Sequence, residues 1–86
     1  MNVHLKVNGP RGEEKILALC KHAEDFKRFT VLQLKQKILE RFKIDNDIRM
    51  VFQTERLEES SLVSKYGIKH MSTIHTLLML PGGMKG

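Results

Sequence analysis

The sequence has only one cysteine, no tryptophan and no long apolar run. Because Cys20 has no second cysteine to pair with, an internal disulfide and a cysteine-based zinc site are both excluded, and we expect a small core residue there. Hydrophobic residues make up 41% of the chain, too many for disorder, but they are too interrupted to span a membrane. We expect a soluble protein with one domain, because 86 residues suffice for a single core.

A secretory leader is also lacking, because no apolar segment with a small-residue cleavage site follows the first residues. We therefore expect a location in the cytoplasm, the nucleus or both. The formal charge of +5 permits weak attraction to nucleic acids or to acidic proteins, but it does not establish either.

Arrangements typical of catalytic and metal-binding sites are missing as well. The four histidines lack the spacing of a metal site, and no third group is apparent to orient Cys20 and His22 as nucleophile and base. Glu13 and Glu14 are adjacent acids, which on a strand point to opposite faces and do not act as a pair. We expect no enzyme activity, no cofactor and no metal.

The first part of the chain has the pattern of a β-hairpin. Apolar residues alternate with polar ones over residues 2–7, a turn-forming Asn-Gly-Pro-Arg-Gly segment follows, and residues 16–20 are an apolar run. Residues 21–29 show neither strand nor helix periodicity and contain five charged side chains. We expect an exposed loop there, with Phe26 or Phe29 folding back.

One amphipathic helix is predicted after that loop. Thr30 and Gln33 fit a capping box, in which each side chain bonds to the other residue's backbone N–H. Apolar residues then recur at spacings of three and four, at Val31, Leu34, Ile38 and Phe42. We expect the basic residues Lys35, Lys37 and Arg41 to fall largely on the solvated side.

Two further strands and a short one are predicted after the helix. Residues 48–52 alternate, with Met50 and Phe52 on one face and Arg49 and Val51 on the other. A short strand is expected around Leu57.

The last strand spans residues 72–80, where Ile74, Thr76 and Leu78 alternate with His75, Leu77 and Met79. The order of elements predicts an α+β fold, with one amphipathic helix packed across a mixed sheet.

Four segments of the second half carry a family resemblance. RMVF at residues 49–52, RLEE at 56–59, SKYGI at 64–68 and STIH at 72–75 resemble the ubiquitin-like β-grasp family, without a gap from Arg49 to Gly83. The helix also fits the family, whereas the segment from residue 9 to 29 is longer than the family's. The resemblance implies a ubiquitin-like domain over residues 1–83, with residues 84–86 as an extension or the start of a following region.

The resemblance also implies a binding surface. The family's apolar recognition patch matches Val51, His75 and Leu77, and we include the neighbouring Arg49. Strand alternation agrees, because Val51 and Leu77 fall opposite the expected core face. Single apolar residues are nonetheless common on protein surfaces, so exposure alone does not indicate function.

The tail contains the glycine pair Gly82 and Gly83, which by itself is typical of a linker. The resemblance implies that Gly83 is conjugated to target amines after a protease removes residues 84–86. Met79 and Pro81 stand where ubiquitin has arginines, and this weakens the prediction of activation by the ubiquitin-activating enzyme.

Two functions therefore compete. The favoured one is a protein–protein interaction module at the N-terminus of a longer protein, with ubiquitin-receptor-type proteins, proteasome components or other ubiquitin-pathway proteins as partners. The alternative is a modifier precursor that meets an activating enzyme and a processing protease. We expect no membrane partner. Weak nucleic-acid binding is a minor alternative, through the basic residues Lys21, Lys27, Arg28, Lys35, Lys37, Arg41 and Lys43.

Overall fold

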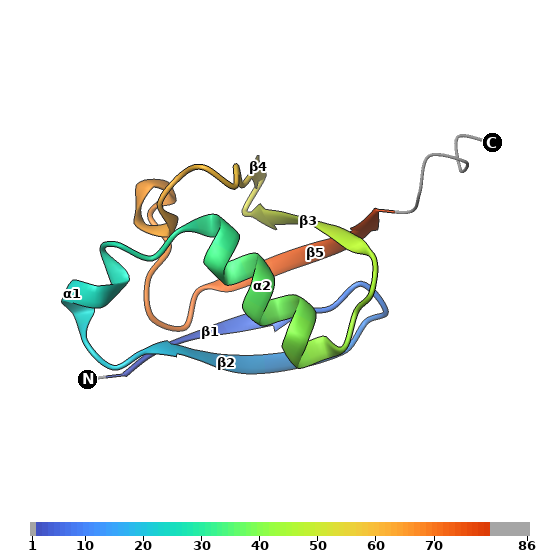
Figure 1. Ribbon diagram of the computed structural model, residues 1–86, viewed down its shortest axis with the longest axis horizontal. Helices are drawn as coiled ribbons and strands as arrows, with labels where there is room; N and C mark the ends of the chain where they lie inside the picture. The colour runs from blue at the N-terminus through green and yellow to red at the C-terminus, as the bar shows by residue number, and fades with distance from the viewer. Residues whose placement is uncertain (1, 80–86) are drawn as a thin grey trace.

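A five-stranded mixed sheet carries one long helix across one face (Figure 1). The computed structural model describes residues 2–79. Its elements are β1 (Val3–Asn8), β2 (Glu14–Cys20), α1 (Ala23–Phe26), α2 (Val31–Phe42), β3 (Asp47–Phe52), β4 (Glu55–Arg56), the 3-10 helix η1 (Val63–Tyr66) and β5 (Thr73–Met79). The strand order is β2-β1-β5-β3-β4, and only β1 and β5 run parallel among these neighbours. The predicted α+β, β-grasp architecture is confirmed.

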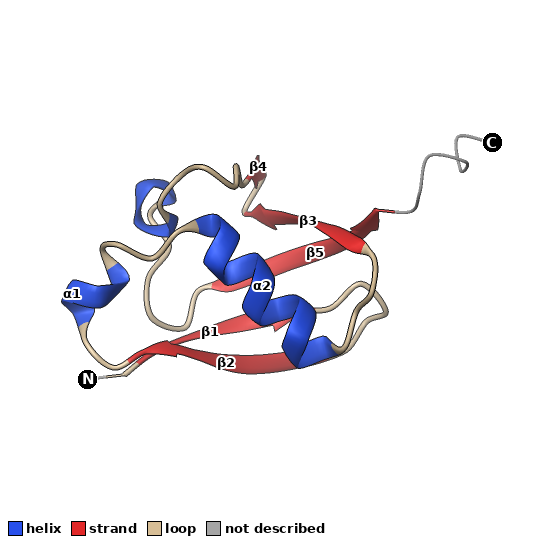
Figure 2. Cartoon of the chain, viewed as in Figure 1, coloured by secondary structure: helices blue, strands red, loops and turns tan. Residues whose placement is uncertain are grey.

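Figure 2 shows α2 lying across one face of the sheet, and the core side chains come from both of these layers. The predicted apolar stripe of the helix is buried, with Leu34 and Ile38 at 0% exposure. On the sheet, Leu5 and Ile74 are equally inaccessible and belong to the same cluster. The strand and helix periodicities therefore meet in one layer of side chains, which excludes water from the centre of the domain.

Both ends of α2 follow from local chemistry. The Thr30 hydroxyl accepts a hydrogen bond from the Gln33 N–H at 3.1 Å, and the Gln33 side chain accepts one from the Thr30 N–H at 2.9 Å. This confirms the predicted capping box, which satisfies N–H groups that the first helical turn leaves without partners. At the other end Lys43 has a φ of 55°, and this left-handed residue closes the helix after Phe42.

The prediction of an exposed loop over residues 21–29 is wrong in part. The short helix α1 occupies part of this segment, and Phe26 and Phe29 are both buried, each with 9% exposure. The Phe29 carbonyl accepts a hydrogen bond from the Val63 N–H at 2.9 Å, which ties the segment to η1. Both rings belong to the core cluster, and burying a phenylalanine side chain stabilises a fold by about 1.5–3 kcal/mol, which favours folding the segment back.

Two expectations for individual core residues also need correction. Phe52, predicted in the core, is half-buried, because it is the last residue of β3, beside the turn into β4; its ring still packs against the core cluster. Cys20 is likewise half-buried, and its thiol donates a weak hydrogen bond to the His22 carbonyl at 3.5 Å. Burial raises the pKa of this thiol, so its reactive thiolate form is disfavoured.

Candidate functional site

The sheet face opposite α2 brings the four predicted patch residues together. In the register of β3 against β5, Arg49 lies opposite Leu77 and Val51 lies opposite His75. The intervening pair consists of Met50 and Thr76, which point to the other face and are buried. Adjacent cross-strand pairs on one face have side chains in contact range, so these four residues form one surface. We call it the sheet-face patch.

Leu77 is the apolar centre of this patch. It is 55% exposed, more than any other large hydrophobic residue that the structure describes. Val51 was expected to be exposed but is half-buried, because its neighbours on β4 and β5 cover part of it. Met79 extends the apolar surface along the same face of β5, with 37% exposure. The patch is therefore a small apolar strip that a partner could cover.

Polar groups border this strip. The Asn8 side-chain nitrogen lies 3.1 Å from Nδ1 of His75, and an amide nitrogen can only donate. With this assignment Nδ1 accepts, so the ring proton lies on Nε2, for which no acceptor is found among the described residues. In the other cross-strand pair, Arg49 with Leu77, the Nε atom of Arg49 is buried and has no hydrogen-bond partner among the described residues. The patch thus has an apolar centre with Arg49 and His75 beside it.

Asn8 is a residue of this site that sequence reasoning missed. It reaches His75 only because β1 and β5 are parallel neighbours, with Asn8 and His75 in register. The two residues are separated by 67 positions in the chain. Strand alternation assigns a residue to a face but does not say which strands are adjacent, so the pattern held no direct signal for this contact.

A family model described as the Ubiquitin family matches residues 27–81. The chain belongs to the ubiquitin family. The matched span contains α2, β3, β4, η1 and β5, and so it includes both strands of the sheet-face patch.

A solved structure described as a de novo design based on ubiquitin shares this fold. Its TM-score is 0.77 at 16% sequence identity, and the match covers 94% of this chain and 93% of the designed one. At so low an identity the match shows the fold alone. The β1–β2 hairpin, which precedes the span of the family model, therefore also takes part in an architecture of the ubiquitin type.

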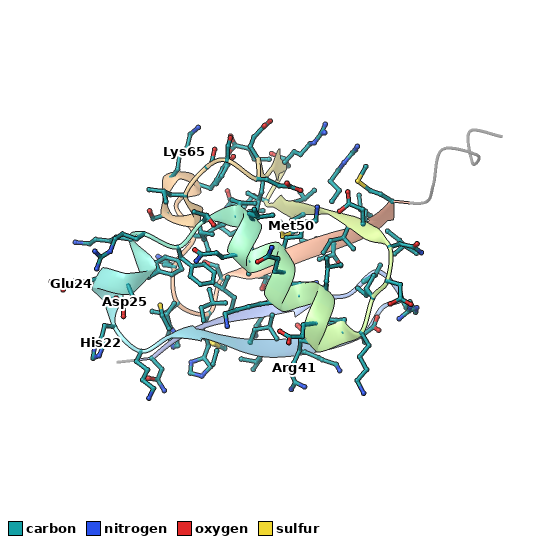
Figure 3. The ribbon with its side chains drawn as sticks, viewed as in Figure 1. His22, Glu24, Asp25, Arg41, Met50 and Lys65 are labelled. Atoms are coloured by element: carbon teal, nitrogen blue, oxygen red, sulfur yellow. The ribbon has the colours of Figure 1, made fainter. Side chains whose placement is uncertain are left out.

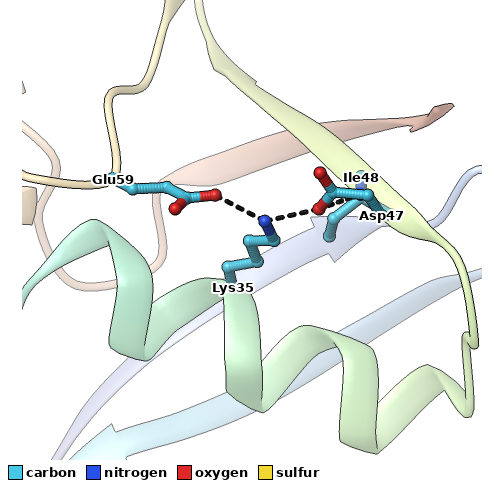
Figure 4. Close-up of polar contacts among 4 residues, drawn as sticks. All are labelled: Lys35, Asp47, Ile48 and Glu59. Atoms are coloured by element: carbon cyan, nitrogen blue, oxygen red, sulfur yellow. Dashed lines mark hydrogen bonds and ion pairs between the residues drawn. The ribbon is translucent and has the colours of Figure 1, made fainter.

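In this ubiquitin-family domain Lys35 is not the solvated cation that the helix pattern predicted. Its side chain is only 13% exposed, and its ammonium group contacts the carboxylates of both Asp47 and Glu59 (Figure 4). These contacts tie α2 to the start of β3 and to the segment after β4. Lys35 is therefore removed from the basic surface that a nucleic acid would need.

The charges of this cluster stabilise one another. Hydrogen bonding to Asp47, and then to Glu59, raises the pKa of Lys35. The same lysine lowers the pKa of Asp47, which also accepts the Ile48 N–H at 2.9 Å. The charged forms of Lys35 and Asp47 therefore favour each other. Because the cluster joins α2 to β3, its role is to hold these elements together.

Among the described residues, the His, Cys, Asp and Glu side chains outside the patch do not form a metal site. Within residues 2–79, no three His, Cys, Asp or Glu side chains are grouped so that they could hold a metal ion. Figure 3 shows His22, Glu24 and Asp25 around α1. Across the same part of the chain, no helix combines the length and apolarity needed to cross a membrane. The predicted conjugation residues, Gly82 and Gly83, lie outside the described residues.

Proposed function

We propose that this ubiquitin-family domain is a non-catalytic protein–protein interaction domain, recognised through the sheet-face patch of Arg49, Val51, His75 and Leu77. The observation that carries the proposal is the register of β3 against β5, which gathers these four side chains around the exposed Leu77.

The chemistry of the patch indicates the kind of partner. The strip is narrow and bordered by the half-buried cation Arg49 and the exposed His75, so it suits an amphipathic helix or a small zinc-finger domain that offers one apolar side chain and a carboxylate. These are features of ubiquitin-receptor-type proteins, and we infer that the partners belong to the ubiquitin pathway, the proteasome included. Because so few side chains take part, we expect a Kd on the order of 100 µM, or about −5.5 kcal/mol.

The arrangement we favour is an interaction module within a longer polypeptide. Ubiquitin, which is conjugated, has arginines at the positions of Met79 and Pro81, and this chain has neither. Proline also lacks the backbone N–H that an arginine would supply at position 81. A tail without those cations suits a fixed domain better than a substrate for activation.

The experiment replaces the apolar centre of the patch. Leu77→Asp places a charge where a partner must bury apolar surface, and we expect at least fivefold weaker binding to a panel of helical and zinc-finger ubiquitin receptors by calorimetry. Leu32→Asp is the matched control, because Leu32 is 41% exposed but lies on α2. Both variants should keep the wild-type melting temperature within a few degrees. Equal binding by both variants would overturn the role of the patch.

The second candidate function, conjugation through Gly83, is suggested by the Gly-Gly pair, which comes directly after the span matched by the family model. A terminal carboxylate at Gly83 would have no side chain nearby to obstruct adenylation and thioester transfer. A chain ending at Gly83 can be incubated with ATP and activating enzymes, and the thioester sought by mass. We expect no thioester while ubiquitin charges in parallel. A robust thioester would place the modifier role first.

A further inference from the structure

A hollow with a volume of about 580 Å³ lies where β5 begins, between the turn from β3 to β4 and the segment that leads from η1 into β5. The side chains that matter for its chemistry come from both sides. Phe52 and Gln53 line it from the end of β3 and the turn after it, and Lys69, Ser72, Thr73 and His75 line it from the other side.

The hollow adjoins the sheet-face patch. His75 belongs to both, and Thr73 lies on the same face of β5, because Ile74 between them points to the other face and is buried. A partner that covers the patch along β5 therefore reaches the hollow as well.

The polar side chains around the hollow can donate hydrogen bonds. Lys69 is exposed, and its ammonium group forms no ion pair with another described residue. The Ser72 hydroxyl accepts the Lys69 N–H at 2.9 Å, so its own proton is left to donate. None of the described residues that line the hollow is an aspartate or a glutamate. The hollow is therefore suited to an anion.

The Phe52 ring gives the hollow an apolar part. Phe52 is half-buried, so one part of its ring packs against the core while another part lines the hollow. A cation and hydroxyl groups beside an aromatic ring match a carboxylate on a short apolar stem, such as a glutamate side chain.

The turn that carries two of the donors is held in place before any ligand binds. The Ser72 N–H donates to the Lys69 carbonyl at 2.9 Å, which closes the turn. The Met71 N–H donates to the His4 carbonyl at 2.6 Å, and the His4 N–H donates to Nδ1 of His70 at 3.0 Å. These bonds fix the turn against β1, so little backbone ordering is needed on binding.

Distances along β5 set the spacing of the groups that a partner must offer. Residues of a strand rise by about 3.3 Å each, so Leu77 lies about 7 Å from His75 and about 13 Å from Thr73. The hollow is thus centred about 10 Å from the apolar centre of the patch. Seven residues of an α-helix rise by about 10.5 Å and return to the same face of that helix.

We propose that the hollow binds the carboxylate of a glutamate on a helix of the partner, seven residues from the apolar side chain that covers Leu77. The helix follows β5, the carboxylate pairs with Lys69 and accepts the Ser72 hydroxyl, and the stem of the glutamate packs on Phe52. Charge complementarity identifies the residue type, because Lys69 is the one lysine or arginine among the described residues that line the hollow. This inference rests on the proposed function, because it concerns the partner of the sheet-face patch.

The first test uses the whole 86-residue chain and helical peptides of one composition. Each peptide carries a leucine for the patch and one glutamate, placed seven residues from the leucine or, as the control, five residues away and on the opposite face of the helix. Pairs with the glutamate before and after the leucine cover both directions of the helix. In one direction we expect the seven-residue peptide to bind at least fivefold more tightly than its control, by calorimetry.

A lysine variant shows whether Lys69 makes the contact. Lys69→Gln should reduce this difference between the two peptides to less than twofold and leave the Kd of the five-residue peptide within twofold of the wild-type value. Lys37→Gln makes the same change at an exposed lysine of α2 and should keep the full difference. Equal binding of the two peptides to the wild type, or the full difference in Lys69→Gln, would overturn the proposal.

A small probe tests the hollow independently of the patch. Butyrate has the apolar stem and carboxylate of a glutamate side chain, and it should shift the amide resonances of Lys69, Ser72 and Thr73, whereas neutral butyramide should not. Leu77→Asp should abolish peptide binding and preserve the butyrate shifts. If Leu77→Asp leaves peptide binding unchanged, the proposed function fails; if butyrate gives no shifts, or butyramide gives the same ones, the carboxylate site fails.

Discussion

Replacing Ile38 with alanine tests the helix register that positions the whole sheet. Ile38 lies in the middle of α2 with 0% exposure and belongs to the same core cluster as Leu5 and Ile74 of the sheet. Because both the helix and the sheet are held by their own hydrogen bonds, the space left by a shorter side chain cannot close fully. The variant should therefore be folded but much less stable.

The magnitude follows from the atoms removed. Ile38→Ala deletes three buried carbons, worth about 2.4 kcal/mol at ~0.8 kcal/mol each. Incomplete collapse around the site adds a cavity term, which brings the expected loss to about 3–4 kcal/mol. A domain of this size has a total stability of roughly 4–13 kcal/mol. The variant should thus lose a quarter of its stability or more, and its Tm should fall by more than 10 °C, on the order of 4–8 °C per kcal/mol.

Urea unfolding followed by circular dichroism measures the difference directly. The matched control is Lys37→Ala, one residue earlier on the same helix, whose side chain is exposed and should cost less than about 0.5 kcal/mol. The slope of free energy against urea should be equal for the two variants. Losses of the same size for Ile38→Ala and Lys37→Ala would refute the assignment of the buried face of α2.

Two further predictions concern the turn and the ion cluster. Gly9→Ala should cost about 1–3 kcal/mol in urea unfolding, because a Cβ there would lie 2.7 Å from the Phe42 ring. Gly12→Ala should cost only about 1 kcal/mol, because an added Cβ there meets no other atom and the cost comes from the φ of 94° alone. A larger loss for Gly12→Ala than for Gly9→Ala would contradict this difference. Asp47 contributes to the free energy of unfolding through its lowered pKa. This contribution is fully present above the ordinary pKa of 3.8 and is lost as the pH falls through the lowered pKa of the folded state. Because the Asp47 side chain is 53% exposed, Asp47→Asn should reduce the loss of unfolding free energy on acidification by at most about 1 kcal/mol. The same loss in the variant and the wild type would exclude the pairing of Asp47 with Lys35.

The helix and the strands could be predicted because the spacing of their apolar residues and their end-capping residues favour the same elements that the fold contains. The capping box at Thr30 depends on residues three positions apart, and the buried stripe of α2 depends on spacings of three and four. Neither requires knowledge of distant neighbours. The same holds for β3 and β5, whose alternation assigned Arg49, Val51, His75 and Leu77 to one face before their pairing was known.

Contacts between distant segments could not be predicted in this way. Lys35 lies on the polar side of the helix pattern, yet Asp47 and Glu59 reach it from two other elements and cover it. Periodicity reports which way a side chain leaves its own helix, but not what stands beside that helix. The partial burial of Phe52 has the same origin, because it depends on where β3 ends.

The contact of Asn8 with His75 depends on the order of strands in the sheet. It requires β1 and β5 to be parallel neighbours. Hydrophobic pattern alone is compatible with several strand orders, so it did not predict this contact.

The most direct test of the central claim is an NMR titration of the isotope-labelled domain with a helical ubiquitin-receptor peptide. We predict that the amides of Arg49, Val51, His75 and Leu77 shift progressively with added peptide, with a Kd on the order of 100 µM. Leu77→Asp should abolish these shifts, whereas Leu32→Asp should preserve them. Saturable shifts confined to other parts of the domain, with these four amides unmoved, would contradict the proposed recognition surface.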